Sequence, residues 1–314
     1  MFPNPQTILW WTLLSCTCAS VVCSSAPARV LVYTATERFR HDSIPTAVEA
    51  LKNQSSNINV VFDHTEDQTQ FTDPVLAGYD AIMFVSTTGE GKASLMRHPV
   101  LDASGKAAFQ HYLNLGGNFV GVHSSSDSLV NTTFYGNETG AYFDYHPVIQ
   151  NATVDVVDAS HPSTSMLPAE WHIQEEMYNF KSDPRAIGAV VVLSANESSY
   201  IDTGTRKFNQ GTPHPSAWFQ EHGAGVESGN IAGRSFYTSL GHLNETWQAN
   251  LWRFFPDPLF MAHVIGGLTW TLGANTTRAF NASGLVGNAG SSTSSTASSS
   301  APALSPSDKY AFFC

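Results

Sequence analysis

The amino-acid sequence predicts an α/β fold built around a parallel sheet. Short apolar runs alternate with stretches of helical periodicity through the first 130 residues, which is the order expected of βαβ units. The runs are continuously apolar, which is typical of central parallel strands that are buried on both faces. We expect strands at residues 29–34, 58–62, 81–85 and 119–122, helices at 43–51 and 102–115, and a short helical turn at 74–79.

The two helices have recognisable ends. Ser43 is a plausible N-cap and Pro45 lies in the first turn of the first helix, with apolar residues recurring behind it at helical spacing. The pair Gly116-Gly117 ends the second helix and leads into the strand at 119–122. The small residue Gly121 within that strand allows close packing or a sharp turn.

The second half of the chain is less regular. Residues 128–150 read as a long loop, and the stretches after it read as strands with few helices between them. We expect these strands to extend the sheet or to form an antiparallel flap, and a helix at 258–272 to close the domain. The expected strands are 153–157, 178–180, 189–193, 216–219 and 235–240.

The two ends of the chain differ in composition from the middle. Residues 1–25 carry no charge and resemble a secretory signal peptide that is cleaved around residues 25–28, with a membrane anchor as the alternative. Residues 26–283 form the folded domain, and residues 284–314 form a Ser/Thr-rich disordered tail. The tail lacks the hydrophobic stretch that a lipid-anchor signal needs, so either it is free or the chain lacks a C-terminal piece. The protein is therefore expected to be secreted, in the extracellular space, the cell wall or at the cell surface.

Charge and cysteine content exclude several functions. A net charge of −11 and a pI near 5.4, with no basic run, argue against nucleic acid as a partner. Three of the four cysteines lie in the leader and the fourth is the terminal residue, so the domain has neither a disulfide framework nor a thiol nucleophile. Eight Asn-x-Ser/Thr sequons are consistent with a glycosylated, exported protein; they are Asn53, Asn131, Asn137, Asn151, Asn196, Asn244, Asn275 and Asn281.

Histidines follow two of the expected strands, where ligands collect in an open parallel sheet. His123 follows the strand at 119–122, and His242 follows the strand at 235–240. The two meet only if both strands share one edge of one sheet. The alternative for His123 is an ordinary buried strand with a polar exit loop.

Carboxylates accompany these histidines. Asp42 can orient the ring of His41 or cap the following helix. In the pair Glu175-Glu176 only one side chain can face a site, because neighbours on a strand point to opposite faces. A solvated acidic turn is the alternative for this pair.

Histidines and carboxylates together can bind a divalent metal ion or perform general acid–base catalysis. No HExxH or CxxC spacing is present, and no nucleotide-binding glycine motif occurs. The stretch Gly121 to Ser126 approximates a nucleophile elbow without the G-x-S-x-G pattern, which leaves a Ser124 esterase as a weaker alternative.

Several stretches, in this order, resemble the trehalose-utilization (ThuA-like) family. They are Arg29-Val-Leu-Val-Tyr-Thr, Phe39-Arg-His-Asp-Ser-Ile, Gly116-Gly-Asn-Phe-Val-Gly-Val-His, Phe143-Asp-Tyr-His-Pro, His161-Pro, Glu175-Glu-Met-Tyr, Gly233-Arg-Ser-Phe-Tyr-Thr-Ser-Leu-Gly-His and Ile265-Gly-Gly-Leu-Thr-Trp. The resemblance implies a three-layer, flavodoxin-like parallel sheet with helices on both faces, as in class I glutamine amidotransferases. Those enzymes carry a cysteine where this chain has Val122-His123-Ser124, so the resemblance implies their fold without their activity.

The family is linked to sugar metabolism, particularly to keto-disaccharides. We therefore expect a secreted protein that acts on a carbohydrate, with a divalent metal ion as the one cofactor the residues suggest; the alternative is a non-catalytic carbohydrate-binding or cell-wall module. His123, Glu176 and His242 are the expected catalytic residues and tentative metal ligands, and His41, Asp42 and His146 are the expected substrate-binding residues. The sequence leaves the reaction type and the oligomeric state open.

Overall fold

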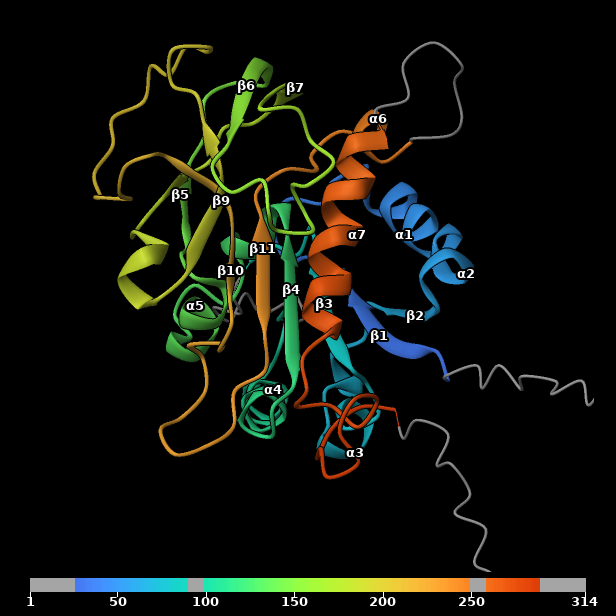
Figure 1. Ribbon diagram of the computed structural model, residues 1–314. Helices are drawn as coiled ribbons and strands as arrows, with labels where there is room; N and C mark the ends of the chain where they lie inside the picture. The colour runs from blue at the N-terminus through green and yellow to red at the C-terminus, as the bar shows by residue number, and fades with distance from the viewer. Residues whose placement is uncertain (1–25, 90–98, 249–257, 289–314) are drawn as a thin grey trace, which may run out of the picture.

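The computed structural model describes residues 26–89, 99–248 and 258–288. Within these residues one large sheet runs through the molecule, in the order β2-β1-β3-β4-β11-β10-β9-β6-β7 (Figure 1). The first five strands are parallel, and they place their carboxyl ends along one edge. Their bounds are β1 Ala28–Tyr33, β2 Val60–Thr65, β3 Ala81–Val85, β4 Asn118–Val122 and β11 Ser235–Thr238.

The other four strands extend the sheet in antiparallel pairs. They are β10 Pro215–Gln220, β9 Val190–Ala195, β6 Gln150–Val156 and β7 Glu170–Glu175. A separate pair, β5 Phe143–Tyr145 with β8 Asn179–Phe180, is antiparallel as well. Both expectations for the second half of the chain, an extended sheet and an antiparallel flap, are thus found together, and the parallel sheet makes up only half of the architecture.

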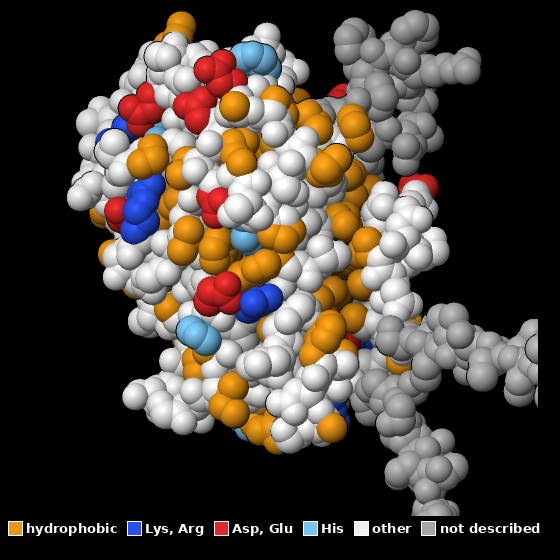
Figure 2. Space-filling model, viewed as in Figure 1, with side chains coloured by type: hydrophobic (Ala, Val, Ile, Leu, Met, Phe, Trp, Pro, Cys, Tyr) orange, Lys and Arg blue, Asp and Glu red, His pale blue; other side chains and the backbone are white. Residues whose placement is uncertain are grey.

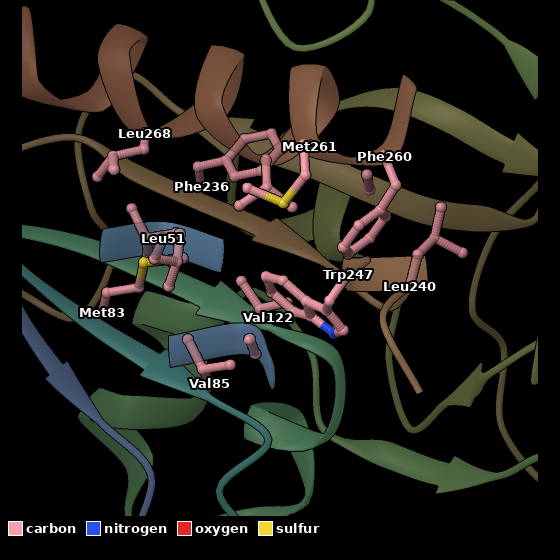
Figure 3. Close-up of a cluster of buried hydrophobic side chains, with 14 of the residues drawn as sticks. Leu51, Met83, Val85, Val122, Phe236, Leu240, Trp247, Phe260, Met261 and Leu268 are labelled. Carbon is pink, nitrogen blue, oxygen red and sulfur yellow. The ribbon is translucent and has the colours of Figure 1, made fainter. Parts of the chain in front are cut away.

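Helices cover both faces of the parallel half, which confirms the predicted three-layer α/β fold. On one face, α1 (Ile44–Asn53) and α7 (Pro258–Leu272) pack on β3, β4 and β11. Figure 3 shows Leu51, Phe260 and Leu268 from these helices lying against Met83, Val122 and Phe236 from the strands. On the other face, Phe109 and Tyr112 of α4 (Ala103–Asn114) and Tyr135 of α5 (Thr133–Thr139) pack against Tyr33, Phe84 and Phe119. Shorter helices are α2 Ser55–Ile58, α3 Asp73–Leu76 and α6 Asn244–Trp247.

Three predicted segments differ from the structure. The strand expected at 58–62 begins later, at Val60, because Ile58 ends α2 and Asn59 turns the chain with a positive φ of 53°. The loop expected at 128–150 contains α5 and β5, whose side chains are mixed polar and aromatic and so lack a clear apolar period. Strand β7 was not predicted, since it is an edge strand whose polar residues alternate with buried ones.

A buried amide joins three central strands. Asn118 at the start of β4 donates to the carbonyl of Asp80 (2.8 Å) and accepts from the backbone N–H of Arg234 (2.9 Å). It thereby ties the β3 and β11 sides of the sheet to β4.

The folded domain continues beyond the predicted boundary at residue 283. Val286 is buried in the core on the α4 face, and the backbone N–H of Asn288 donates to Asp80 (3.2 Å). Residues 284–288 therefore belong to the domain. Residues 1–25 and 289–314 lie outside the described residues, so the leader and the rest of the tail stay predictions.

The surface shows where the sequon asparagines and the basic side chains lie. Of the eight sequon asparagines none is buried: five are exposed and Asn137, Asn196 and Asn244 are half-buried. On the face shown in Figure 2, Lys and Arg side chains are scattered and form no basic patch. No helix in the described parts of the chain combines the length and apolar character of a membrane span.

Glu138 on α5 gives a prediction about stability. Its side chain is buried, one carboxylate oxygen accepts from Gly225 N–H (3.0 Å), and the other has no partner among the described residues. Burial raises the pKa of Glu138 from 4.5 to about 8, against the smaller opposing effect of the Gly225 bond. The folded state therefore favours the protonated acid, and the stability present below pH ~4.5 is lost as the pH rises towards 8.

We expect Glu138→Gln, which resembles the protonated acid, to match the wild type near pH 4. At pH 8 it should be more stable by about 3–5 kcal/mol in urea unfolding. If the variant and the wild type differ in stability by the same amount at both pH values, the pKa of the Glu138 carboxyl is not raised in the folded protein.

Candidate functional site

Three loops meet at the carboxyl edge of the parallel strands. His41 lies in the loop between β1 and α1, His123 directly follows β4, and His242 lies between β11 and α6. Because β4 and β11 pair in parallel, with Val122 opposite Thr238, both chains leave the sheet at the same edge. His123 and His242 therefore follow neighbouring strands at one edge of one sheet, which is the arrangement that they need in order to meet.

His123 occupies a sharp turn between β4 and the short 3₁₀-helix His123–Asp127. Its φ of 56° is in the left-handed region, which histidine enters more readily than most side chains. The turn brings the chain back over β4, and a Cβ on Gly121 would lie 2.8 Å from Ser125 Oγ. A side chain at position 121 would press on Ser125 and Tyr237, so the close return favours glycine, as its size suggested.

The His123 ring is fixed at one nitrogen and open to its neighbours at the other. Nδ1 donates to the carbonyl of Ser239 (2.8 Å), which leaves Nε2 with its lone pair. That Nε2 lies 3.1 Å from Nε2 of His41 and 3.2 Å from Nδ1 of His242. Three imidazole nitrogens from distant parts of the chain therefore converge on one point.

Glu176 completes the cluster. One of its carboxylate oxygens is 3.1 Å from His242 Nδ1 and 3.7 Å from His123 Nε2, and the other is 3.4 Å from Nε2 of His146. The His146 Nδ1 donates to the carbonyl of Pro147 (2.8 Å), so its Nε2 also faces the site with a lone pair. His146 is the most open of these groups, with 34% of its side chain exposed.

Glu175 supports the site from behind. Its carboxylate accepts from the backbone N–H groups of Gly241 (2.7 Å), His242 (3.1 Å) and Glu176 (2.9 Å). Glu175 thus links the loop that carries His242 to the backbone of Glu176. Gly241 has a φ of 123°, which this turn demands of a glycine. The alternative of a solvated acidic turn is wrong, because Glu175 and Glu176 are 1% and 6% exposed.

Tyr178 also belongs to the site, although the sequence alone did not indicate a role for it. Its hydroxyl donates to His123 Nε2 (3.1 Å), and its ring packs on Phe143 with the centroids 4.5 Å apart. The signal that could have found it is the spacing: Glu176 and Tyr178 are two apart on an extended segment, so they face the same side.

Asp42 and Ser124 have smaller parts in this arrangement. Asp42 is exposed, and no hydrogen bond to His41 or to the start of α1 is found for it among the described residues; its charge contributes to raising the pKa of His242. Ser124 is buried, and its hydroxyl lies 3.4 Å from His41 Nδ1, longer than the contact of an activated nucleophile with its base. His123, rather than a serine, stands at the elbow itself.

The electrostatics favour neutral rings at the centre. Burial, followed by the neighbouring His242 and His146, lowers the pKa of His41 to about 3. Burial and then His41 lower the pKa of His123 well below its usual value, against the opposing bond to Ser239. Burial alone would lower the pKa of His242, but the hydrogen bond and charge of Glu176 raise it above the usual value. Burial raises the pKa of Glu175, against the three backbone bonds that it accepts.

This donor set fits a divalent metal ion. The ligand atoms of His41, His123 and His242 all lie within 4.8 Å of one another, and neutral imidazole is the form that binds metal. Three histidines that leave further positions open are typical of catalytic rather than structural zinc sites. Ser239 and Ser124 supply the outer partners that orient two of the rings. Of the predicted site residues, the structure brings together His41, His123, His146, Glu176 and His242.

Solved structures with a similar fold include a protein described as ThuA-like from Bacteroides uniformis, with 20% identity and a TM-score of 0.55, covering 76% of this chain and 91% of its own. A second, from Parabacteroides merdae, has 16% identity and a TM-score of 0.51, covering 79% and 90%. A glutaminase domain from Trypanosoma brucei aligns with 11% identity and a TM-score of 0.40, covering 77% and 94%. At these identities the likeness to the Bacteroides uniformis and Parabacteroides merdae proteins concerns the fold alone. No curated protein matches the sequence.

A comparison with family models gives a direct assignment. The model described as trehalose utilisation matches residues 29–271, which span the nine-stranded sheet and all of the residues that converge at its edge. The role is thus carbohydrate-related, as the resemblance implied. This chain belongs to the ThuA family.

Proposed function

We propose that this protein is a metal-assisted enzyme that converts a sugar or keto-sugar at the carboxyl edge of its sheet. The observation that carries the proposal is the convergence of three imidazole nitrogens beside the Glu176 carboxylate. His41, His242 and Tyr178 all approach the single lone pair of His123 Nε2, which accepts only one hydrogen bond, so the convergence needs a further reason. A divalent cation supplies that reason.

The residues have four proposed functions. His41 and His123 through Nε2, and His242 through Nδ1, hold the cation. When bound, a divalent cation polarises a carbonyl oxygen and stabilises the negative charge that develops on it. Glu176, as a carboxylate next to the cation ligands, accepts a proton from the substrate. Tyr178 donates a hydrogen bond to a substrate oxygen once His123 Nε2 is engaged as a ligand. His146, the most open group, contacts the sugar at the rim.

The substrate is proposed to be extracellular. The uncharged leader pattern in residues 1–25 and the five exposed sequon asparagines support export and glycosylation. The acidic net charge supports a neutral sugar rather than nucleic acid as the partner.

The test is turnover of trehalose and of its mono-keto derivative, followed by NMR, with and without a chelator. We expect conversion of the keto-sugar that stops when the metal is removed and returns when Zn²⁺, Mn²⁺ or Co²⁺ is added back. Binding of sugar without product under every metal would favour a non-catalytic carbohydrate-binding module. In a parallel assay with p-nitrophenyl acetate, ester hydrolysis that ignores the chelator and is blocked by a serine-reactive phosphonate would favour the Ser124 esterase.

A further inference from the structure

One large aromatic ring stands in solvent at the rim of this site. Phe39 is 61% exposed, the highest value among the phenylalanines in the described residues. Its ring meets the edge of His41, with the centroids 4.7 Å apart, and lies nearly parallel to His242 at 6.3 Å. Phe39 therefore touches two of the three proposed metal ligands and still shows most of its surface to water.

The exposure of Phe39 is not a consequence of a loose loop. Its carbonyl accepts from Thr88 Oγ1 (2.6 Å), and the backbone N–H of Glu37 donates to the carbonyl of Thr88 (2.8 Å). Arg40, on the other side, pairs with Glu66 at 2.7 Å. The loop is thus hydrogen-bonded through Glu37 and Phe39 to Thr88, which follows β3, and it is paired through Arg40 with Glu66, which follows β2. A ring that is held in place but not covered keeps its apolar face available to a ligand.

The exposed apolar face of the Phe39 ring suits a closed sugar ring as its ligand. A closed sugar ring is amphipathic, because its hydroxyl groups project around the rim while its C–H bonds gather on a face. Such a face can bury apolar area on an aromatic side chain while the hydroxyls reach polar groups beside it. An open-chain polyol has the same hydroxyls but no rigid C–H face, and it must lose more conformational freedom to make one.

We infer that Phe39 is the platform on which a closed sugar ring stacks, so that a second part of the same sugar reaches His41 and His242. The inference rests on the proposed function for the position of the reacting group, but the stacking itself concerns binding. Phe39 is a positioning residue for the substrate and takes no part in bond making.

The experiment compares Phe39→Ala, Phe39→Trp and a control, Phe280→Ala. Phe280 is similarly exposed, at 57%, and lies near Thr277 in the C-terminal segment that packs beside Asp80, away from the histidines. The probes are mono-keto trehalose and trehalose as closed rings, sorbitol as an open-chain polyol, and Zn²⁺ alone. Sugar affinity is measured by calorimetry, and in the Trp variant also by the fluorescence of the new indole.

We expect Phe39→Ala to weaken closed-ring binding, and to raise KM for the keto-sugar, by about tenfold. The Zn²⁺ affinity and kcat should change less than twofold, Phe39→Trp should restore sugar binding, and Phe280→Ala should change nothing. Equal loss of Zn²⁺ affinity in Phe39→Ala would overturn the inference, because the ring would then serve to hold His41. Unchanged sugar affinity in Phe39→Ala, or no binding of either sugar by the wild type, would also overturn it. Sugar binding that depends on Phe39 in a protein that takes no metal would support the platform while contradicting the proposed metal chemistry.

Discussion

His123→Asn is expected to remove divalent-metal binding and turnover together. Asparagine tolerates the positive φ at this turn, so the substitution removes the imidazole without adding the backbone strain that alanine would suffer. Loss of an outer partner of a metal ligand costs about 10–100-fold in affinity, and loss of a ligand itself should cost more. Calorimetric titration with Zn²⁺ should show affinity reduced by more than about 100-fold, and the keto-sugar assay should fall to background.

The matched control is His263→Asn. His263 is also fully buried but lies outside the site: its ring nitrogens contact the Ser163 carbonyl (2.9 Å) and Thr238 Oγ1 (3.0 Å). It should lose stability through these contacts and keep its metal affinity. If both variants lose metal to the same degree, the effect of His123→Asn reflects general loosening and not a lost ligand.

The second large effect is expected for Glu176→Gln. The amide keeps the size and much of the hydrogen bonding of Glu176 towards His146 and His242, but it cannot accept a proton in the reaction. Turnover should fall about 10²–10⁴-fold, the usual range for a lost general base, while Zn²⁺ affinity falls by less than about tenfold. Glu138→Gln serves as the control and should keep full turnover, because Glu138 is buried beside Ser235 at the start of β11, the end of that strand opposite to His242.

Two other results for Glu176→Gln would change the assignment. Retained turnover would show that another group accepts the proton. Complete loss of bound metal would make Glu176 a ligand, which its 3.1 Å contact with His242 Nδ1 also allows.

The parallel half of the fold could be predicted because its signals are local. Strands β1, β3 and β4 are largely apolar and buried, β2 begins with an apolar run, and the helix before β4 ends at a recognisable glycine, Gly116. The antiparallel half depends on pairing between strands that are far apart in the sequence. In addition, β7 and α5 contain many polar residues, so their sequences resemble those of loops. Sheet order cannot be deduced from either kind of signal, although it decides which loops meet.

The members of the site could be predicted in part for the same reason. His123 and His242 were identified because each follows a strand, His41 because it lies beside Asp42 in the loop after the first strand, and Glu176 because it is paired with Glu175. Their convergence needed β11 to lie beside β4, which the sequence does not state. The support from Glu175 through three backbone N–H groups, and the contact of Tyr178 with His123, depend on tertiary geometry that no motif records.

The most direct measurement is anomalous diffraction from crystals grown with Zn²⁺, collected on both sides of the zinc absorption edge. We predict one peak per chain, about 2.0–2.2 Å from Nε2 of His41, Nε2 of His123 and Nδ1 of His242. A crystal in which the three rings keep these positions but no zinc peak lies between them would contradict the metal centre, and with it the proposed chemistry.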